Sequence, residues 1–150
     1  MDISIADKAR RVMAGDHYAV DTTGIEIDEV YEDSVWCSLA VFEKHCNVRG
    51  VVMGGAIFTL ADFSAAILVN YPSILNDWPF QWVTVSSDIH FLLPATGSHL
   101  KAHSSFIRQG RSLSVICTEI VDSDNRTIAS VTTTSSRIKQ STNNKLNDSN

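Results

Sequence analysis

The segment GGAIFTLADFSAAILVN, residues 54–70, constrains the fold of this chain most strongly. It is apolar almost throughout and consists of good helix formers, and Asn70 followed by Tyr71-Pro72 predicts where the helix ends. One broad stripe of this helix should face a protein core, and it contains Ile57, Leu60, Ala61, Ser64, Ala65 and Leu68. The other side is also apolar except for Asp62, so we expect the helix to be buried nearly all round.

Two segments before this helix and four after it have the pattern of β-strands. The first two lie within residues 24–43, on either side of an acidic turn at Glu32-Asp33. The later segments cover residues 83–93, 99–109, 112–122 and 127–138, with a tight hairpin expected at Gln109-Gly110-Arg111. The segment PSILNDWPFQ, residues 72–81, is expected to be a looser connection to the next strand.

Residues 83–93 show the clearest alternation in the chain. The pattern predicts one face made of Val83, Val85, Ile89, Phe91 and Leu93. It predicts an opposite, polar face made of Thr84, Ser86, Asp88 and His90. Such a strand is typical of a sheet with one face packed on a core.

The order of these elements predicts the fold class. A short helix capped by Asp2 or Ser4 should reach about Met13, within an N-terminal helical segment of residues 1–20. One long apolar helix among six strands indicates an α+β architecture, in which an antiparallel β-sheet wraps around one central α-helix. We expect a single domain over residues 1–138 and a disordered polar tail at 139–150.

Composition and charge exclude several classes of protein. The net charge of −5 argues against nucleic-acid binding, and no apolar run is long enough to span a membrane. No signal peptide is recognisable, and three widely spaced cysteines fit reduced thiols, so we expect a cytoplasmic protein. His99 and His103 lie about 13 Å apart along a strand, too far to share a metal ion, and we expect no metal site.

Asp62 is unusual because a buried carboxylate is costly and raises its pKa unless it has a partner. One interpretation is structural: Asp62 bonds a neighbouring loop, or its side of the helix is half exposed. The other is catalytic. Gly54 and Gly55 leave the first helical amides open to a ligand oxygen, which resembles an oxyanion hole with a carboxylate two turns further along.

The motif Asn47-x-x-Gly50-x-x-Met53-Gly54-Gly55, followed by Leu60-Ala61-Asp62, resembles the signature of hotdog-fold acyl-CoA thioesterases. It is most similar to the PaaI-like branch of the 4-hydroxybenzoyl-CoA thioesterase superfamily. The resemblance continues through Val83-Thr84-Val85, the Phe91–Ala95 segment, Gly97 and the Gln109–Arg111 hairpin, over roughly residues 20 to 138.

The resemblance implies hydrolysis of an acyl- or aryl-CoA thioester to the free acid and coenzyme A. Asn47 and the Gly54 amide are expected to polarise the thioester carbonyl. Asp62 is expected to activate water, as a general base or through a transient anhydride, helped by Thr84. The active site would lie between two subunits of a homodimer or homotetramer, and coenzyme A would be required only as part of the substrate.

The remaining candidates are substrate-binding residues. Met53, Gly55 and Phe58 are expected near the acyl-CoA, and Arg49 and Arg111 near the phosphates of coenzyme A. His45, beside the motif, could contact the substrate, but a loop histidine is more often solvated, and we interpret it as a solvated loop residue.

Met53 departs from the pattern, because many relatives have histidine there and methionine offers no comparable hydrogen bond. The alternative function is therefore a non-catalytic acyl-CoA-binding protein on the same fold.

Overall fold

The computed structural model describes residues 2–139, and the polar tail predicted at 139–150 lies almost entirely outside them. The first half of the chain contains α1 (Ile5–Met13), the π-helix η1 (Tyr18–Thr23), β1 (Ile25–Val30), β2 (Ser34–Ala40), the short 3-10 helix η2 (Glu43–His45) and α2 (Gly54–Val69). The second half contains α3 (Tyr71–Asn76), β3 (Trp82–Phe91), β4 (His99–Gln109), β5 (Leu113–Asp122) and β6 (Thr127–Arg137). No helix in this described part of the chain combines the length and apolar character needed to cross a membrane.

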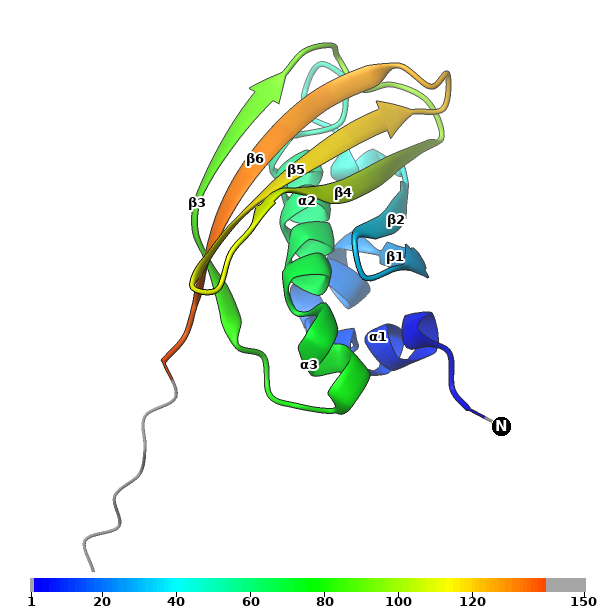
Figure 1. Ribbon diagram of the computed structural model, residues 1–150. Helices are drawn as coiled ribbons and strands as arrows, with labels where there is room; N and C mark the ends of the chain where they lie inside the picture. Colours follow the sequence, from blue (N-terminus) through cyan, green and yellow to red (C-terminus); the bar gives the residue numbers. More distant parts are fainter. Residues whose placement is uncertain (1, 140–150) are drawn as a thin grey trace, which may run out of the picture.

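The six strands form one antiparallel sheet in the order β1-β2-β4-β5-β6-β3. The sheet curves around α2, which contacts every strand (Figure 1). Strands β1 and β3 are its two edges. The predicted α+β architecture, a sheet wrapped around one central helix, is therefore confirmed.

The predicted core stripe of α2 is buried over its whole length. One member, Ser64, accepts a hydrogen bond from Ser104 on β4, and Ser104 is 2.6 Å from the hydroxyl of Thr118 on β5. All three hydroxyls are fully buried, so each would be costly without these partners. The chain of hydroxyls therefore fixes the rotation of α2 against the sheet, and with it the direction of Asp62.

Helix α2 ends where predicted, but the segment after it differs from the prediction, because residues 71–76 form the short helix α3. Asn70 separates the two helices, and Pro72 lies in the first turn of α3, where proline needs no amide partner. The buried Asn70 side chain donates to the Ala66 carbonyl and accepts from the amides of Gln81 and Trp82. It therefore ties the start of β3 to the end of α2.

A β-bulge corrects the predicted faces of β3. Thr84 pairs with Ser135, whereas Ser86 pairs with Thr134, so Val85 is an extra residue in the strand. Paired residues share a face, and Ser135 is buried beneath the sheet, so Thr84 lies on the same face as Ile89 and Phe91. The strict alternation predicted for residues 83–93 was wrong at this position, and the bulge directs Thr84 toward α2.

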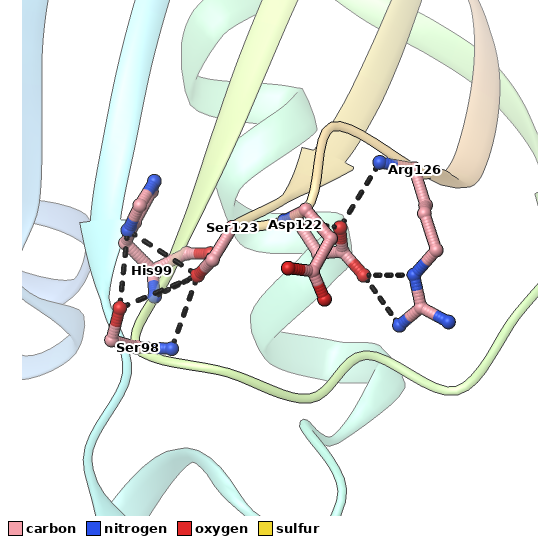
Figure 2. A network of polar contacts seen from close by, with 6 residues as sticks. Ser98, His99, Asp122, Ser123 and Arg126 are labelled. Carbon is pink, nitrogen blue, oxygen red and sulfur yellow. Dashed lines mark hydrogen bonds and ion pairs between the residues drawn. The ribbon is translucent and has the colours of Figure 1, made fainter.

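The turn between β5 and β6 holds the segment that leads from β3 to β4. Figure 2 shows Asp122 facing Arg126, and the guanidinium of Arg126 keeps the pKa of Asp122 below its usual range. The next residue, Ser123, accepts hydrogen bonds from the amides of Ser98 and His99, each at 3.2 Å. The hairpin thereby fixes the loop that contains Gly97.

Replacing Gly97 by alanine should destabilise the protein for two reasons. Gly97 has φ +102°, and a Cβ there would lie 2.9 Å from the Ser123 hydroxyl. Gly24 is a matched control, because its φ is +88° but a Cβ would meet nothing within 4 Å. We expect Gly97→Ala to lower the free energy of unfolding by about 1 kcal/mol more than Gly24→Ala, measured in urea. Equal losses would show that Ser123 leaves room for a side chain.

Candidate active site

Asp62 lies on the side of α2 that the sheet does not cover. The positions around it on this side, Gly55, Phe58 and Ala66, are all at least partly exposed, and Asp62 itself is half-buried. The Thr84 hydroxyl on β3 donates to the Asp62 carboxylate at 3.3 Å. The two residues are brought together by the bulge, which turns Thr84 toward the helix.

The surroundings of Asp62 raise the pKa of its carboxyl group. Partial burial is the main cause, because it disfavours the charged form. The hydrogen bond from Thr84 acts in the opposite direction, since it stabilises the carboxylate. The negative charge of Asp16, just after α1, raises the pKa again. A carboxylate with a raised pKa is a stronger base than an ordinary aspartate.

The second part of the candidate site is the N-terminus of α2. Met53 is the N-cap but makes no capping bond with its side chain. Within residues 2–139, the amides of Gly54 and Gly55 have no hydrogen-bond acceptor. Gly54 packs against the Phe91 ring, and a Cβ at position 54 would lie 2.9 Å from that ring. Two open amides at the positive end of a helix can bind an anionic or polarised oxygen.

The loop before α2 is shaped around Asn47. The side-chain oxygen of Asn47 accepts the amide of Arg49 at 2.9 Å, and its backbone carbonyl accepts the amide of Gly50, which has φ +77°. In the described part of the chain, the Asn47 side-chain amide has no acceptor. Both carbonyl oxygens of Asn47 thus stabilise the turn, while the two N–H groups of its side chain remain available to a ligand.

The predicted catalytic residues, with the neighbouring binding residues Met53 and Gly55, form two groups within one protomer. Asn47, Met53, Gly54 and Gly55 gather at the start of α2, whereas Asp62 and Thr84 lie further along it. Asp62 follows Gly54 by eight positions, which corresponds to about 12 Å along the helix. Phe58 is half-buried between the groups. One thioester carbonyl cannot contact both groups in the same protomer, because each needs to be about 3 Å away.

The two arginine candidates lie at opposite ends of the protomer. Arg49 is exposed in the loop before α2. Arg111 lies in the β4–β5 hairpin, which Figure 1 shows beside the far end of α2. There it lines a depression of about 280 Å³ together with Trp78, Trp82 and Arg137. The structure therefore brings Arg49, but not Arg111, close to Gly54 of the same chain.

His45 is a residue that the sequence analysis misjudged. It is 5% exposed and hydrogen-bonded through both ring nitrogens, so the prediction of a solvated loop histidine was wrong. No local pattern marks it, because its partners lie in η1 and in its own short turn.

No group of three or more histidine, cysteine or acidic side chains in the described residues is arranged to hold a metal ion. All three cysteines, Cys37, Cys46 and Cys117, are free.

Comparison with known protein families shows which family this chain belongs to. The sequence profile of the thioesterase superfamily matches residues 49–129, more than half of the chain and including α2 with Asp62. The protein belongs to the thioesterase superfamily. No curated protein sequence matches this superfamily member significantly.

Solved structures share its fold. PaaI from the phenylacetic acid degradation operon of Escherichia coli is 25% identical with a TM-score of 0.77, over 91% of this chain and 97% of PaaI. A thioesterase from Haemophilus influenzae is 20% identical with a TM-score of 0.79, over 93% of each chain. A hypothetical thioesterase from Streptococcus pneumoniae, whose structure contains coenzyme A, is 23% identical with a TM-score of 0.72, over 85% of this chain and 98% of its own. The predicted hotdog fold and the resemblance to PaaI-like thioesterases are thus confirmed.

The pKa of Asp62 can be tested without an activity assay. Thr84→Val should raise it further, because the carboxylate loses its only side-chain donor among the described residues. Thr84→Ser keeps the hydroxyl and should leave the pKa nearly unchanged, and Asp16→Asn should lower it. Titration of the carboxyl carbon by NMR measures each value. If Thr84→Val left the pKa of Asp62 unchanged, the hydrogen bond from Thr84 would not be one of the causes that set it.

Proposed function

We propose that the protein is an acyl-CoA thioesterase, which hydrolyses an acyl- or aryl-CoA thioester to the free acid and coenzyme A. The observation that carries the proposal is the Asp62 carboxylate, half-buried on the uncovered side of α2 and hydrogen-bonded to Thr84. Membership of the thioesterase superfamily supports it. The solved relative that contains coenzyme A supports this class of substrate.

In one form of the proposed reaction, Asp62 accepts a proton from water as the water attacks the thioester carbonyl, and the thiolate of coenzyme A leaves and takes up a proton. In the other, the Asp62 carboxylate attacks the carbonyl and expels the thiolate, and water then opens the resulting anhydride to give the free acid. The hydroxyl of Thr84 holds the carboxylate in place. The Gly54 amide and the side-chain N–H of Asn47 polarise the carbonyl and stabilise the charge that develops on its oxygen. No cofactor is required apart from the coenzyme A of the substrate.

We propose that each active site combines two subunits of a homodimer, which can double to a homotetramer. The separation of about 12 Å between Gly54 and Asp62 along one helix supports this. So does the open edge of the sheet, where large apolar side chains are 42–56% exposed: Val83, Val85, Phe91, Leu92 and Leu93. Such a row on an edge strand is typical of a surface covered by a partner. A two-fold axis beside β3 would place Gly54 of one subunit near Asp62 of the other.

The same axis accounts for the two arginine candidates. It would bring the far end of one subunit, with Arg111, toward the start of α2 in the other, with Arg49. We propose that these guanidinium groups contact the phosphates of coenzyme A. We propose that three residues beside the open amides contact the pantetheine or acyl group: Met53, which is 54% exposed, Gly55 and Phe58.

With three free cysteines, the enzyme fits a reducing compartment, and we propose the cytoplasm.

Asp62→Asn should lower kcat about a hundredfold or more, because it keeps the volume and removes the base. Its Tm should stay equal or rise. The raised pKa means that ionising Asp62 opposes folding as the pH increases through that pKa, and asparagine removes this effect. Thiol release from a panel of acyl-CoA substrates measures turnover.

Wild-type turnover in Asp62→Asn would assign Asp62 a structural role. Tight acyl-CoA binding without hydrolysis by the parent protein would favour the alternative, a non-catalytic binding protein, for which Met53 is the sequence argument.

Mixing two variants, each impaired in a different half of the site, tests the shared active site; Asn47→Ala should lower turnover because it weakens polarisation of the carbonyl. In a dimer that contains one Asp62→Asn chain and one Asn47→Ala chain, one site carries both changes and the other carries neither. Co-expression should therefore recover about a quarter of wild-type activity, given random pairing of subunits. A mixture of Asp62→Asn with Asp62→Ala is the control and should recover none. Absence of recovery in the first mixture would place the whole site within one chain, and a stable monomer in sedimentation would exclude the dimer.

A further inference from the structure

The imidazole of His45 joins two segments that are distant in sequence. Its Nδ1 lies 2.9 Å from the amide nitrogen of Phe42, and its Nε2 lies 2.6 Å from the carbonyl oxygen of Thr23. The backbone carbonyl of His45 accepts the amide of Met53 at 2.8 Å. One buried residue thus connects the end of η1, the turn of η2 and the N-cap of α2.

These partners determine which ring nitrogen carries the proton. A backbone amide can only donate, so Nδ1 must accept from Phe42. A carbonyl can only accept, so Nε2 must carry the hydrogen and donate to Thr23. The ring is therefore neutral in this arrangement, with its proton on Nε2. No other uncharged side chain of similar size offers an acceptor and a donor in these two directions.

The packing around His45 is incomplete. A cavity of about 210 Å³ lies between η1 and the start of α2, lined by His45 with Tyr18, Thr22, Lys44, Met53 and Gly55. Ala19 of η1 is buried in the core, and polar contacts join the segments beside this cavity. They are the two ring bonds of the buried His45 and an exposed bond from Lys44 Nζ to the Thr22 carbonyl at 3.0 Å, and they restrain where the N-cap of α2 lies.

The position of this N-cap sets the direction of the open amides. The Met53 N–H and the Gly54 N–H belong to successive peptide planes that meet at the Cα of Met53. While Met53 keeps its N-cap dihedral angles, φ −62° and ψ 138°, a shift of the first plane carries the Gly54 N–H with it. The opposite side of the loop has its own restraint, because the Val52 amide donates to the buried carbonyl of Ala95. His45 is the buried restraint on the side of η1, where Lys44 adds an exposed bond to Thr22.

We propose that His45 is a positioning residue, which holds the Gly54 and Gly55 amides in the direction needed to stabilise the oxyanion. The proposal rests on the proposed thioesterase function. His45 touches neither substrate nor water in this role and acts through the backbone of Met53. A misplaced amide weakens the bond to the oxyanion more than the binding of the ground-state thioester, so the effect belongs mainly to kcat.

Three substitutions separate the two ring bonds. His45→Ala removes both. In His45→Asn the side-chain oxygen can replace Nδ1 as acceptor for Phe42, and in His45→Gln the side-chain amide can replace Nε2 as donor to Thr23. His17, whose side chain is 77% exposed and pairs with Asp21, provides matched controls as His17→Asn and His17→Gln.

We expect His45→Ala to lower kcat between about tenfold and a hundredfold with a smaller change in KM. His45→Asn or His45→Gln should recover part of this loss, and the His17 variants should match the wild type. In ¹H–¹⁵N NMR spectra, the Gly54 and Gly55 amide resonances should shift in the His45 variants. Imidazole ¹⁵N spectra of the wild type should show the proton on Nε2.

Several results would overturn the proposal. Wild-type kcat in a folded His45→Ala protein would do so, as would unmoved Gly54 and Gly55 resonances or a proton on Nδ1. If His45→Ala does not fold, the same criteria apply to the asparagine and glutamine variants. If the parent protein hydrolyses no acyl-CoA, the proposed function fails, whereas the NMR measurements still decide whether His45 positions the amides.

Discussion

Burial of α2 inside the curved sheet is the constraint on which the rest of the structure depends. The helix has 16 residues, is apolar around most of its circumference, and is contacted by all six strands. The buried hydroxyls of Ser64, Ser104 and Thr118 fix its rotation. Because the helix cannot turn, Asp62 is held on the side that the sheet leaves open. Any chemistry at Asp62 therefore follows from how the core is packed.

The same helix supplies both chemical groups of the candidate site, a carboxylate and open amides. A rigid helix keeps them about two turns apart, so they cannot converge within one protomer. The exposed apolar edge of β3 lies beside both groups. Oligomerisation and catalysis are consequently linked in the proposed mechanism: the surface that would bury this edge would also complete the active site. Loss of the interface would remove activity without any change to Asp62 or Gly54.

Much of the fold could be predicted because its signals are local. The bounds of α2, its core stripe, the antiparallel strands and the hairpin at Gly110 follow from periodicity and turn residues. The bulge at Val85 could not be predicted, because an inserted residue leaves the apolar-polar alternation almost unchanged while it reverses the face of Thr84. The helix α3 was missed for a related reason. It is short, and it is stabilised by its position after Asn70 more than by its own pattern.

For the candidate site, the sequence by itself determined which residue types are present: a glycine pair at a helix start, an asparagine in the loop before it, and one carboxylate in an apolar helix. Motif spacing was sufficient for this, because the helical repeat fixes how far Asp62 lies from Gly54. The resemblance implied that Thr84 assists Asp62, but only the tertiary structure showed the bulge that turns Thr84 toward it. Only the tertiary structure showed that Asp16 raises the pKa of Asp62 and that His45 is a buried link between η1 and α2. Each of these contacts joins segments far apart in the chain, and their proximity depends on strand register and packing, which no local pattern records.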